Sequence, residues 1–166
     1  MARLTIPRAA WTTRPRGGDS QHPISPILFV HYSASPGAGL DSWQKQAAAI
    51  RAIRDYHVDV NGWLDIGYSF VLTQPAGRVR DARIWRGRGR HRVPASQQGF
   101  NTGNLSVCVI ANDKEEIREK TVLAIAALAK RLNARDIQGH RDVNATSCPG
   151  ERLAAHLPRI RKLAGL

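Results

Sequence analysis

The sequence predicts an α/β domain with a mixed central β-sheet flanked by helices. Short apolar runs rich in β-branched and aromatic residues alternate with longer segments whose apolar residues recur every three or four positions. This alternation is typical of a sheet covered by helices. The 166 residues fit a single domain, residues 1–166, and Pro, Gly and Arg are frequent near its start, which predicts an irregular N-terminal arm over residues 1–26.

The predicted strands are short segments bounded by proline, glycine or polar residues. Pro26 precedes the first of them, and Pro75-Ala76-Gly77 predicts the turn of a hairpin. The expected strands cover residues 27–31, 68–73, 78–84, 105–111 and 136–138.

Three segments of the sequence predict helices. The first spans residues 41–57, with Asp41 or Ser42 as its N-cap. The second spans 117–132, and Asp113 with Glu116 resembles a capping box at its start. The last is expected to begin near Pro149, because proline suits the first turn of a helix.

The net charge of +12 indicates an anionic partner, such as nucleic acid, a membrane surface or an acidic wall polymer. No apolar run approaches the roughly 18 residues of a membrane span, so we expect no membrane insertion. The N-terminal segment carries charge without an apolar stretch of about 7–15 residues, so we expect no signal peptide and synthesis in the cytoplasm. Cys108 and Cys148 are then expected to remain thiols.

The candidate metal ligands come from two segments of the sequence. His31 lies at the end of a predicted strand, and His140 and Cys148 lie near the C-terminus. A catalytic zinc ion takes three protein ligands and leaves one position open, and two histidines with one cysteine satisfy that rule. Taken singly, each of these residues is more often packed in a core or exposed than bound to metal.

Four blocks of sequence, in order along the chain, carry a family resemblance. They are Phe-Val-His-Tyr-Ser-Ala-Ser (29–35), Gly-Trp-Leu-Asp-Ile-Gly-Tyr-Ser-Phe (62–70), Gly-Phe-Asn-Thr-Gly-Asn-Leu-Ser-Val-Cys (99–108) and His-Arg-Asp-Val-Asn-Ala-Thr-Ser-Cys-Pro (140–149). Together they resemble the N-acetylmuramoyl-L-alanine amidases, in the branch of the phage lysozyme-type amidases and the peptidoglycan recognition proteins. The resemblance implies hydrolysis of the amide bond between N-acetylmuramic acid and L-alanine in bacterial peptidoglycan.

The resemblance also implies roles for individual residues. His31, His140 and Cys148 are the implied ligands of Zn²⁺, and Tyr68 is the implied catalytic tyrosine beside the water that the metal activates. Thr146 stands where relatives carry Lys or Thr, and its hydroxyl can donate one hydrogen bond to a developing oxyanion. The alternative for Thr146 is a turn residue that caps the last helix.

The chain departs from the family pattern at three places. Tyr32 replaces a second histidine, which we expect to alter packing or substrate contact and not metal binding. Residues 93–96 lack the histidine of a Gly-(Ser/Ala)-His-Ala block. Cys108 replaces a glutamate that one branch uses in catalysis, which leaves Tyr68 as the expected catalytic group on the strands.

Other charged and titratable residues have weaker interpretations. Residues 78–92 form an arginine-rich segment, which is interpreted either as a solvated loop or as a surface that attracts anionic wall polymers. Its arginines are Arg78, Arg80, Arg83, Arg86, Arg88, Arg90 and Arg92. We expect His57 to make a structural hydrogen bond. Asp65 and Asp142 are candidates for orienting a ligand histidine.

These inferences favour a phage-type endolysin that stays in the host cytoplasm until lysis and then degrades the cell wall, as a bacteriolytic and antimicrobial enzyme. The alternatives are a cytosolic amidase that recycles muropeptides and a non-catalytic peptidoglycan recognition module. A recycling enzyme has no need of a cationic surface, and a pure binder can dispense with the ligands and Tyr68. We expect a monomer. We also expect no specific binding of nucleic acid, because the sequence contains no helix-turn-helix or stacking-platform motif.

Overall fold

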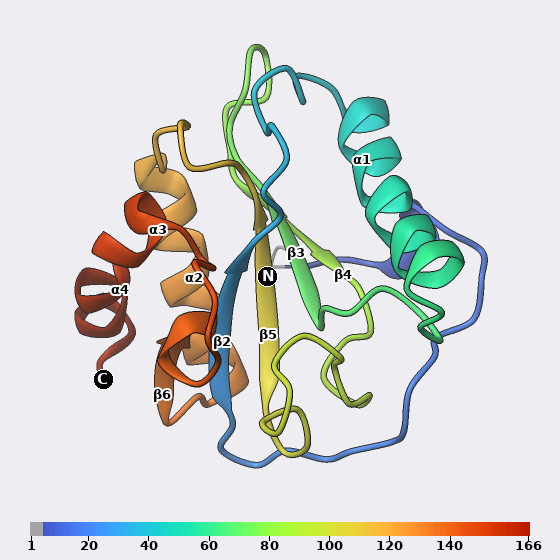
Figure 1. Ribbon diagram of the computed structural model, residues 1–166. Coiled ribbons are helices and arrows are strands. Elements are labelled where there is room, and N and C mark those ends of the chain that lie inside the picture. Colours follow the sequence, from blue (N-terminus) through green and yellow to red (C-terminus); the bar gives the residue numbers. More distant parts are fainter. Residues whose placement is uncertain (1–4) are drawn as a thin grey trace.

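The computed structural model describes residues 5–166 and contains a six-stranded mixed sheet (Figure 1). The strand order is β1-β4-β3-β5-β2-β6. Only β3 and β4 are antiparallel, and the other neighbours run parallel. The strands are β1 (Thr5–Ile6), β2 (Ile27–Tyr32), β3 (Phe70–Thr73), β4 (Arg83–Arg86), β5 (Leu105–Ile110) and β6 (Asp136–Gly139).

Helices cover both faces of this sheet (Figure 1). One face carries α1, and the opposite face carries α2, α3 and α4. Their bounds are α1 (Trp43–Asp55), α2 (Glu119–Leu132), α3 (Glu151–Ala155) and α4 (Leu157–Ala164), with a π-helical turn at Tyr56–Val60 and 3₁₀ turns at Arg8–Ala10 and His140–Asp142. The predicted fold class is therefore confirmed.

The sheet separates two hydrophobic cores, because successive side chains of a strand point to opposite faces. Val30 and Val107 pack with the helices α2, α3 and α4. Val71 and Trp85 pack with α1 on the other face. His31 follows Val30 in β2, so its side chain lies on the α1 face of the sheet. Since β2 and β5 are covered on both sides, their sequences are nearly continuous apolar runs.

Several predicted elements are confirmed closely. The strands expected at 27–31, 105–111 and 136–138 and the helix expected at 41–57 all form within a few residues of their predicted bounds. Ser42 is the N-cap of α1, since its hydroxyl accepts a hydrogen bond from the backbone N–H of Lys45 at 3.3 Å.

The prediction for residues 78–84 was wrong in extent. β4 begins only at Arg83, because Ala76 and Val79 form an isolated bridge that closes a tight turn before the strand. The sequence signal for the turn was correct, but it could not show how many residues the chain needs to return to the sheet.

The predicted capping box of the second long helix was also wrong. α2 begins at Glu119, and its N-cap, Arg118, makes no side-chain capping bond. The loop before it is held by Glu115, whose carboxylate accepts hydrogen bonds from the backbone of Asn112 and Gly37.

The last helix, expected to begin near Pro149, is divided into two. α3 ends at Ala155, and α4 begins at Leu157.

The N-terminal arm is mostly irregular, as predicted, although its residues 1–4 lie outside the described part of the chain. It does more than cross the surface. Arg8 and Trp11 are buried, and Ser20 bridges to Arg92. The arm is therefore part of the packed domain.

Candidate active site

The two histidines of the predicted site are placed by the pairing of two parallel strands. β2 and β6 are neighbours, and Val30 lies opposite Gly139. His31 and His140 each follow one of these paired residues, so both side chains reach the same end of the sheet. Their ring centroids are 4.6 Å apart.

Cys148 completes the group from the turn that follows His140. Its Sγ lies 3.6 Å from Nδ1 of His31, and one donor atom from each of the three residues lies within 4.8 Å of the others. A tetrahedral zinc with ordinary bond lengths, about 2.3 Å to sulfur and about 2.0 Å to nitrogen, brings the two donor atoms to roughly 3.5 Å from each other. The described residues therefore fit a zinc ion, with no fourth His, Cys, Asp or Glu in the group.

Burial determines the charge state of these donors. It lowers the pKa of His31 to about 3, with the nearby His140 adding to the effect. It also lowers the pKa of His140 and raises that of the Cys148 thiol to about 11. At neutral pH both imidazoles are thus uncharged and can offer a lone pair, whereas the thiol keeps its proton until a cation displaces it.

Tyr68 lies two residues before the start of β3 and next to this group. Its ring centroid is 5.3 Å from that of His31. Burial raises the pKa of Tyr68 well above its ordinary value, and Cys108 and Cys148 raise it further, so the hydroxyl keeps its proton at neutral pH. The backbone here is closely packed, since a Cβ on Gly87 would lie 2.4 Å from the carbonyl oxygen of Tyr68.

Thr146 is exposed, and its hydroxyl accepts a hydrogen bond from the backbone N–H of Cys148 at 3.2 Å. This contact supports the turn that carries the cysteine, in keeping with the alternative that Thr146 is a turn residue. The hydroxyl proton remains free to be donated elsewhere.

Three further expectations have clear outcomes. His57 makes the expected structural hydrogen bond, since its Nδ1 accepts from the backbone N–H of Gly67 at 3.0 Å. Asp65 does not orient a ligand histidine, because it is fully buried against Arg8. Asp142 does not do so either, because its carboxylate accepts from the backbone N–H of Gly139 at 2.8 Å.

Two of the positions that depart from the family pattern lie beside the ligands. Tyr32 packs against the core on the α2 side of the sheet, and its hydroxyl donates to Asp113 at 3.3 Å, which supports the packing interpretation of this position. Cys108 lies opposite His31 in the pairing of β2 with β5 and is fully buried. Burial raises the pKa of its thiol, so it stays protonated and offers no general base.

A cavity of about 440 Å³ extends from Tyr68 along α1. Its lining includes Ile53, Tyr56 and His57 on the helix side and Ser33 and Ser35 on the loop after β2. Of these lining residues, Tyr56 was not identified as a candidate from the sequence. The signal available in the sequence was an aromatic residue near the end of an amphipathic helix, and the structure leaves the side chain of Tyr56 58% exposed.

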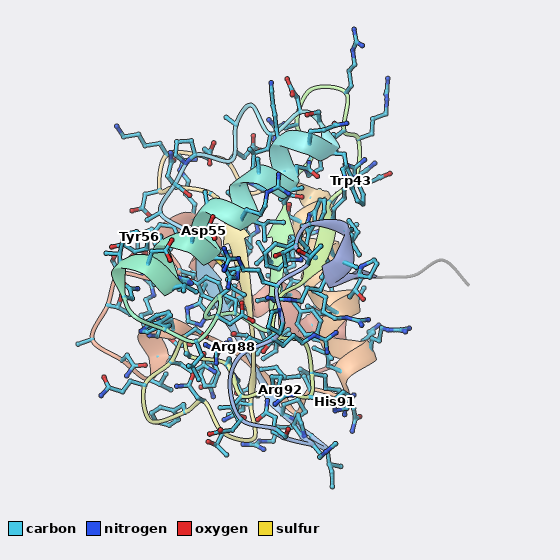
Figure 2. All side chains as sticks on the ribbon, turned by 90° about the vertical axis from the view of Figure 1, so that its right-hand side faces the viewer. Trp43, Asp55, Tyr56, Arg88, His91 and Arg92 are labelled. Atoms are coloured by element: carbon cyan, nitrogen blue, oxygen red, sulfur yellow. The ribbon has the colours of Figure 1, made fainter. Side chains whose placement is uncertain are left out.

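The arginines of residues 78–92 do not form one solvated loop. Arg88, labelled in Figure 2, is buried and donates to the carbonyl oxygens of Ile66 and Val93. Arg83 packs over the ring of Trp43, whereas Arg78 and Arg80 are exposed. Arg88 is therefore a structural residue and is unavailable to a partner.

The fold is that of the peptidoglycan recognition proteins. A structure of bumblebee PGRP-SA superposes with a TM-score of 0.78 at 27% identity, covering 93% of each chain. A complex of tracheal cytotoxin with the ectodomains of PGRP-LCa and PGRP-LCx gives a TM-score of 0.79 at 26% identity, covering 96% of each chain. No protein-family model matches the chain.

Sequence relatives identify the family itself. Peptidoglycan-recognition protein LB of Drosophila melanogaster is 30% identical over 94% of this chain and 68% of its own length. An N-acetylmuramoyl-L-alanine amidase of Mus musculus is 30% identical over 89% of this chain but only 29% of its own length. The chain belongs to the family of N-acetylmuramoyl-L-alanine amidases and peptidoglycan recognition proteins. It spans less than a third of the amidase relatives that it matches.

Proposed function

We propose that the chain is a zinc-dependent amidase that hydrolyses the bond between N-acetylmuramic acid and L-alanine in peptidoglycan. The observation that carries this proposal is the convergence of His31, His140 and Cys148 beside the protonated hydroxyl of Tyr68. A module that only binds peptidoglycan has no need of three ligands that leave a fourth position open. Relatives named as amidases support the same activity.

The residues of the site then have distinct tasks. His31, His140 and Cys148 would hold the zinc ion, and Cys148 would release its thiol proton when the metal binds. Zinc in such a site acts as a Lewis acid that lowers the pKa of water toward about 7 and polarises an amide carbonyl. The Tyr68 hydroxyl donates a hydrogen bond to the oxygen on which negative charge develops, and Thr146 offers a second, uncharged donor.

The cavity beside α1 is the proposed site for the peptide of the substrate. Its volume of about 440 Å³ suits a short peptide stem, and Tyr68 lies at its lining. Ser33 and Ser35 provide polar groups on a wall that also includes the apolar side chains of Ile53 and Ile110. Structures of related recognition proteins contain peptidoglycan fragments, among them tracheal cytotoxin.

For its biological setting we propose a phage-type endolysin that acts as a monomer, remains in the host cytoplasm until lysis, and then reaches the wall. The net charge of +12 favours this role over muropeptide recycling, because anionic wall polymers attract a cationic enzyme. Arg78 and Arg80 are the exposed arginines of the 78–92 segment that are best placed to contribute.

Digestion of purified cell walls tests the proposal. We expect zinc-loaded protein to release new L-alanine amino groups together with free lactyl carboxyl groups on muramic acid. New reducing sugar ends without these groups would indicate a glycosidase instead. Binding to walls without new ends of either kind would identify a recognition module and contradict the proposed activity.

A further inference from the structure

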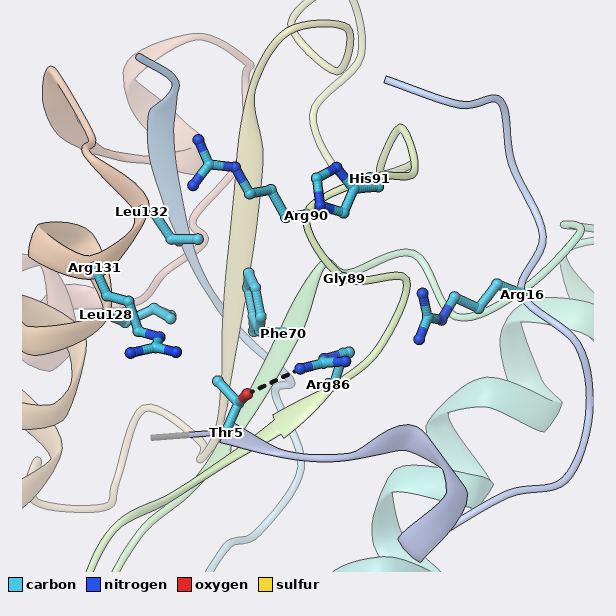
Figure 3. A pocket seen from close by; sticks show the side chains of 10 residues that line it. All are labelled: Thr5, Arg16, Phe70, Arg86, Gly89, Arg90, His91, Leu128, Arg131 and Leu132. Carbon is cyan, nitrogen blue, oxygen red and sulfur yellow. Dashed lines mark hydrogen bonds between the residues drawn. The ribbon is translucent and has the colours of Figure 1, made fainter. Parts of the chain in front are cut away.

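A second cavity, of about 450 Å³, is lined by four arginines (Figure 3). Arg16 comes from the N-terminal arm, Arg86 from β4, Arg90 from the loop that follows, and Arg131 from α2. Phe70 of β3 lies between them in the close-up view. Four separate segments of the chain therefore bring cationic groups to one place.

This cavity lies on the side of the sheet away from the zinc ligands. Phe70 and Leu128, which line it, belong to the core between the sheet and α2. His31 points to the α1 face instead, as do Tyr68 and the cavity beside it. The cationic cavity is thus separate from the proposed active site, and a ligand bound there need not take part in the amidase reaction.

The four guanidinium groups have no acidic partner among residues 5–166. The ion pairs of the described chain involve other arginines, such as Arg8 with Asp65 and Arg159 with Glu119. Arg90 is held by a neutral acceptor, the carbonyl oxygen of Pro23 at 2.7 Å, and Arg86 contacts the Thr5 hydroxyl at 3.5 Å. Like charges gathered without counter-charge repel one another, so an anion in the cavity would be stabilising.

The chemistry of the lining selects among anions. Phe70 and Leu128 are only 4% and 1% exposed, so the apolar floor offers little surface and charge dominates the binding energy. A carboxylate carries one charge, whereas a phosphate carries up to two and has several acceptor oxygens. Guanidinium groups bind phosphate through paired hydrogen bonds. We propose that this cavity binds phosphate groups of a compact, multiply charged ligand.

Inorganic pyrophosphate is a suitable probe, with binding measured by titration calorimetry at low ionic strength. The test variant is Arg16→Gln with Arg131→Gln, because neither side chain makes a hydrogen bond within the described structure. The control variant is Arg14→Gln with Arg118→Gln, which removes the same charge from exposed positions outside the cavity. Thermal unfolding of each variant checks that the fold is retained, and the single variant Arg131→Gln replaces the double one if it is not.

We expect one pyrophosphate to bind per chain. The cavity variant should bind it at least about tenfold more weakly than the wild type, a loss of roughly 1.4 kcal/mol or more of binding free energy. The affinity of the control should stay within about twofold of wild type. Absence of binding to the wild type, or equal losses in the two variants, would overturn the proposal. A third outcome also counts against the proposal. If the protein binds duplex DNA but not pyrophosphate, and both variants weaken the DNA binding equally, only the general effect of net charge has been detected.

The source of the phosphate is distinguished by parallel titrations. A soluble poly(glycerol phosphate) represents a wall polymer, and vesicles of phosphatidylglycerol represent a lipid headgroup. The source is the ligand for which the cavity variant has a lower affinity than the wild type while the control variant has an unchanged affinity. If only pyrophosphate behaves in this way, the ligand is a free phosphate compound.

Discussion

Arg8 of the N-terminal arm donates a hydrogen bond of 2.9 Å to Asp65, 57 residues further along the chain, and both side chains are buried. The same carboxylate lies 3.4 Å from Nε of Arg54, and it also accepts from the backbone N–H of Gly17 at 3.2 Å. The carbonyl oxygen of Asp65 accepts in turn from Arg88 at 3.4 Å. One carboxylate therefore compensates a group of buried cations and fastens the arm to the domain.

We expect Asp65→Asn to lower the free energy of unfolding by about 3–5 kcal/mol, because it leaves buried arginines without a counter-charge. Urea unfolding measures the change. Asp59→Asn is the matched control, since Asp59 is exposed and forms no ion pair among the described residues. Similar unfolding midpoints for the two variants would show that the buried carboxylate contributes little.

The metal content of purified protein tests the ligand assignment. We expect one zinc per chain in the wild type and a large loss in Cys148→Ser, because a hydroxyl is a poor substitute for a thiolate ligand. Cys108→Ser is the control, since Cys108 is buried nearby but outside the cluster of donor atoms. Stoichiometric zinc in a His140→Ala, Cys148→Ser double variant would show that the ligands lie elsewhere.

Removal of one hydroxyl tests the role of Tyr68. We expect Tyr68→Phe to keep its zinc and its fold but to lose about 10²–10³-fold in turnover, the usual effect of removing one donor to a developing oxyanion. Tyr32→Phe removes a hydroxyl that contacts Asp113 and should retain its activity. Wild-type turnover of muropeptides by Tyr68→Phe would make Tyr68 a packing residue.

His57 predicts a dependence of stability on pH. Burial, followed by the charge of Arg88, lowers its pKa from 6.5 to about 4 in the folded protein. Between these values the unfolded chain binds a proton that the folded chain does not, so stability is complete above about pH 6.5 and falls as the pH drops towards 4. The loss is on the order of 3 kcal/mol.

The variant His57→Asn isolates this contribution, because its amide oxygen can accept the hydrogen bond from Gly67 but does not titrate. Urea unfolding at several pH values between 7 and 4 should show a shallower slope for the variant than for the wild type. His31 titrates in both proteins, so the difference between them belongs to His57. Parallel slopes would contradict the assignment.

Local patterns in the sequence were sufficient for the strands around His31 and Cys108 and for the first helix with its Ser42 cap. Local patterns failed where contacts between residues far apart in the sequence determine the structure. The start of α2 depends on Gln74, whose side chain accepts from the backbone N–H of Arg118 across 44 residues. The ion pair of Arg8 with Asp65 likewise has no local signal.

The candidate site was predictable in its residues but not in its surroundings. Motif resemblance supplied His31, His140, Cys148 and Tyr68, and the structure brings these four together. The resemblance could not supply the cavity along α1, because the lining of that cavity comes from segments that lie far apart in the sequence. The burial of Arg88 within an arginine-rich stretch was equally invisible to composition.

The pairing of β2 with β6 has a consequence for how such a domain can diversify. Because adjacent parallel strands deliver His31 and His140, the spacing of the two rings is determined by backbone hydrogen bonds and not by loop conformation. The segment from Ser33 to Ser42 can therefore change in length or composition without displacing the ligands. Exchange of this loop on an unchanged pair of histidines would therefore reshape the cavity that Ser33 and Ser35 line, which makes the segment a practical position for grafting.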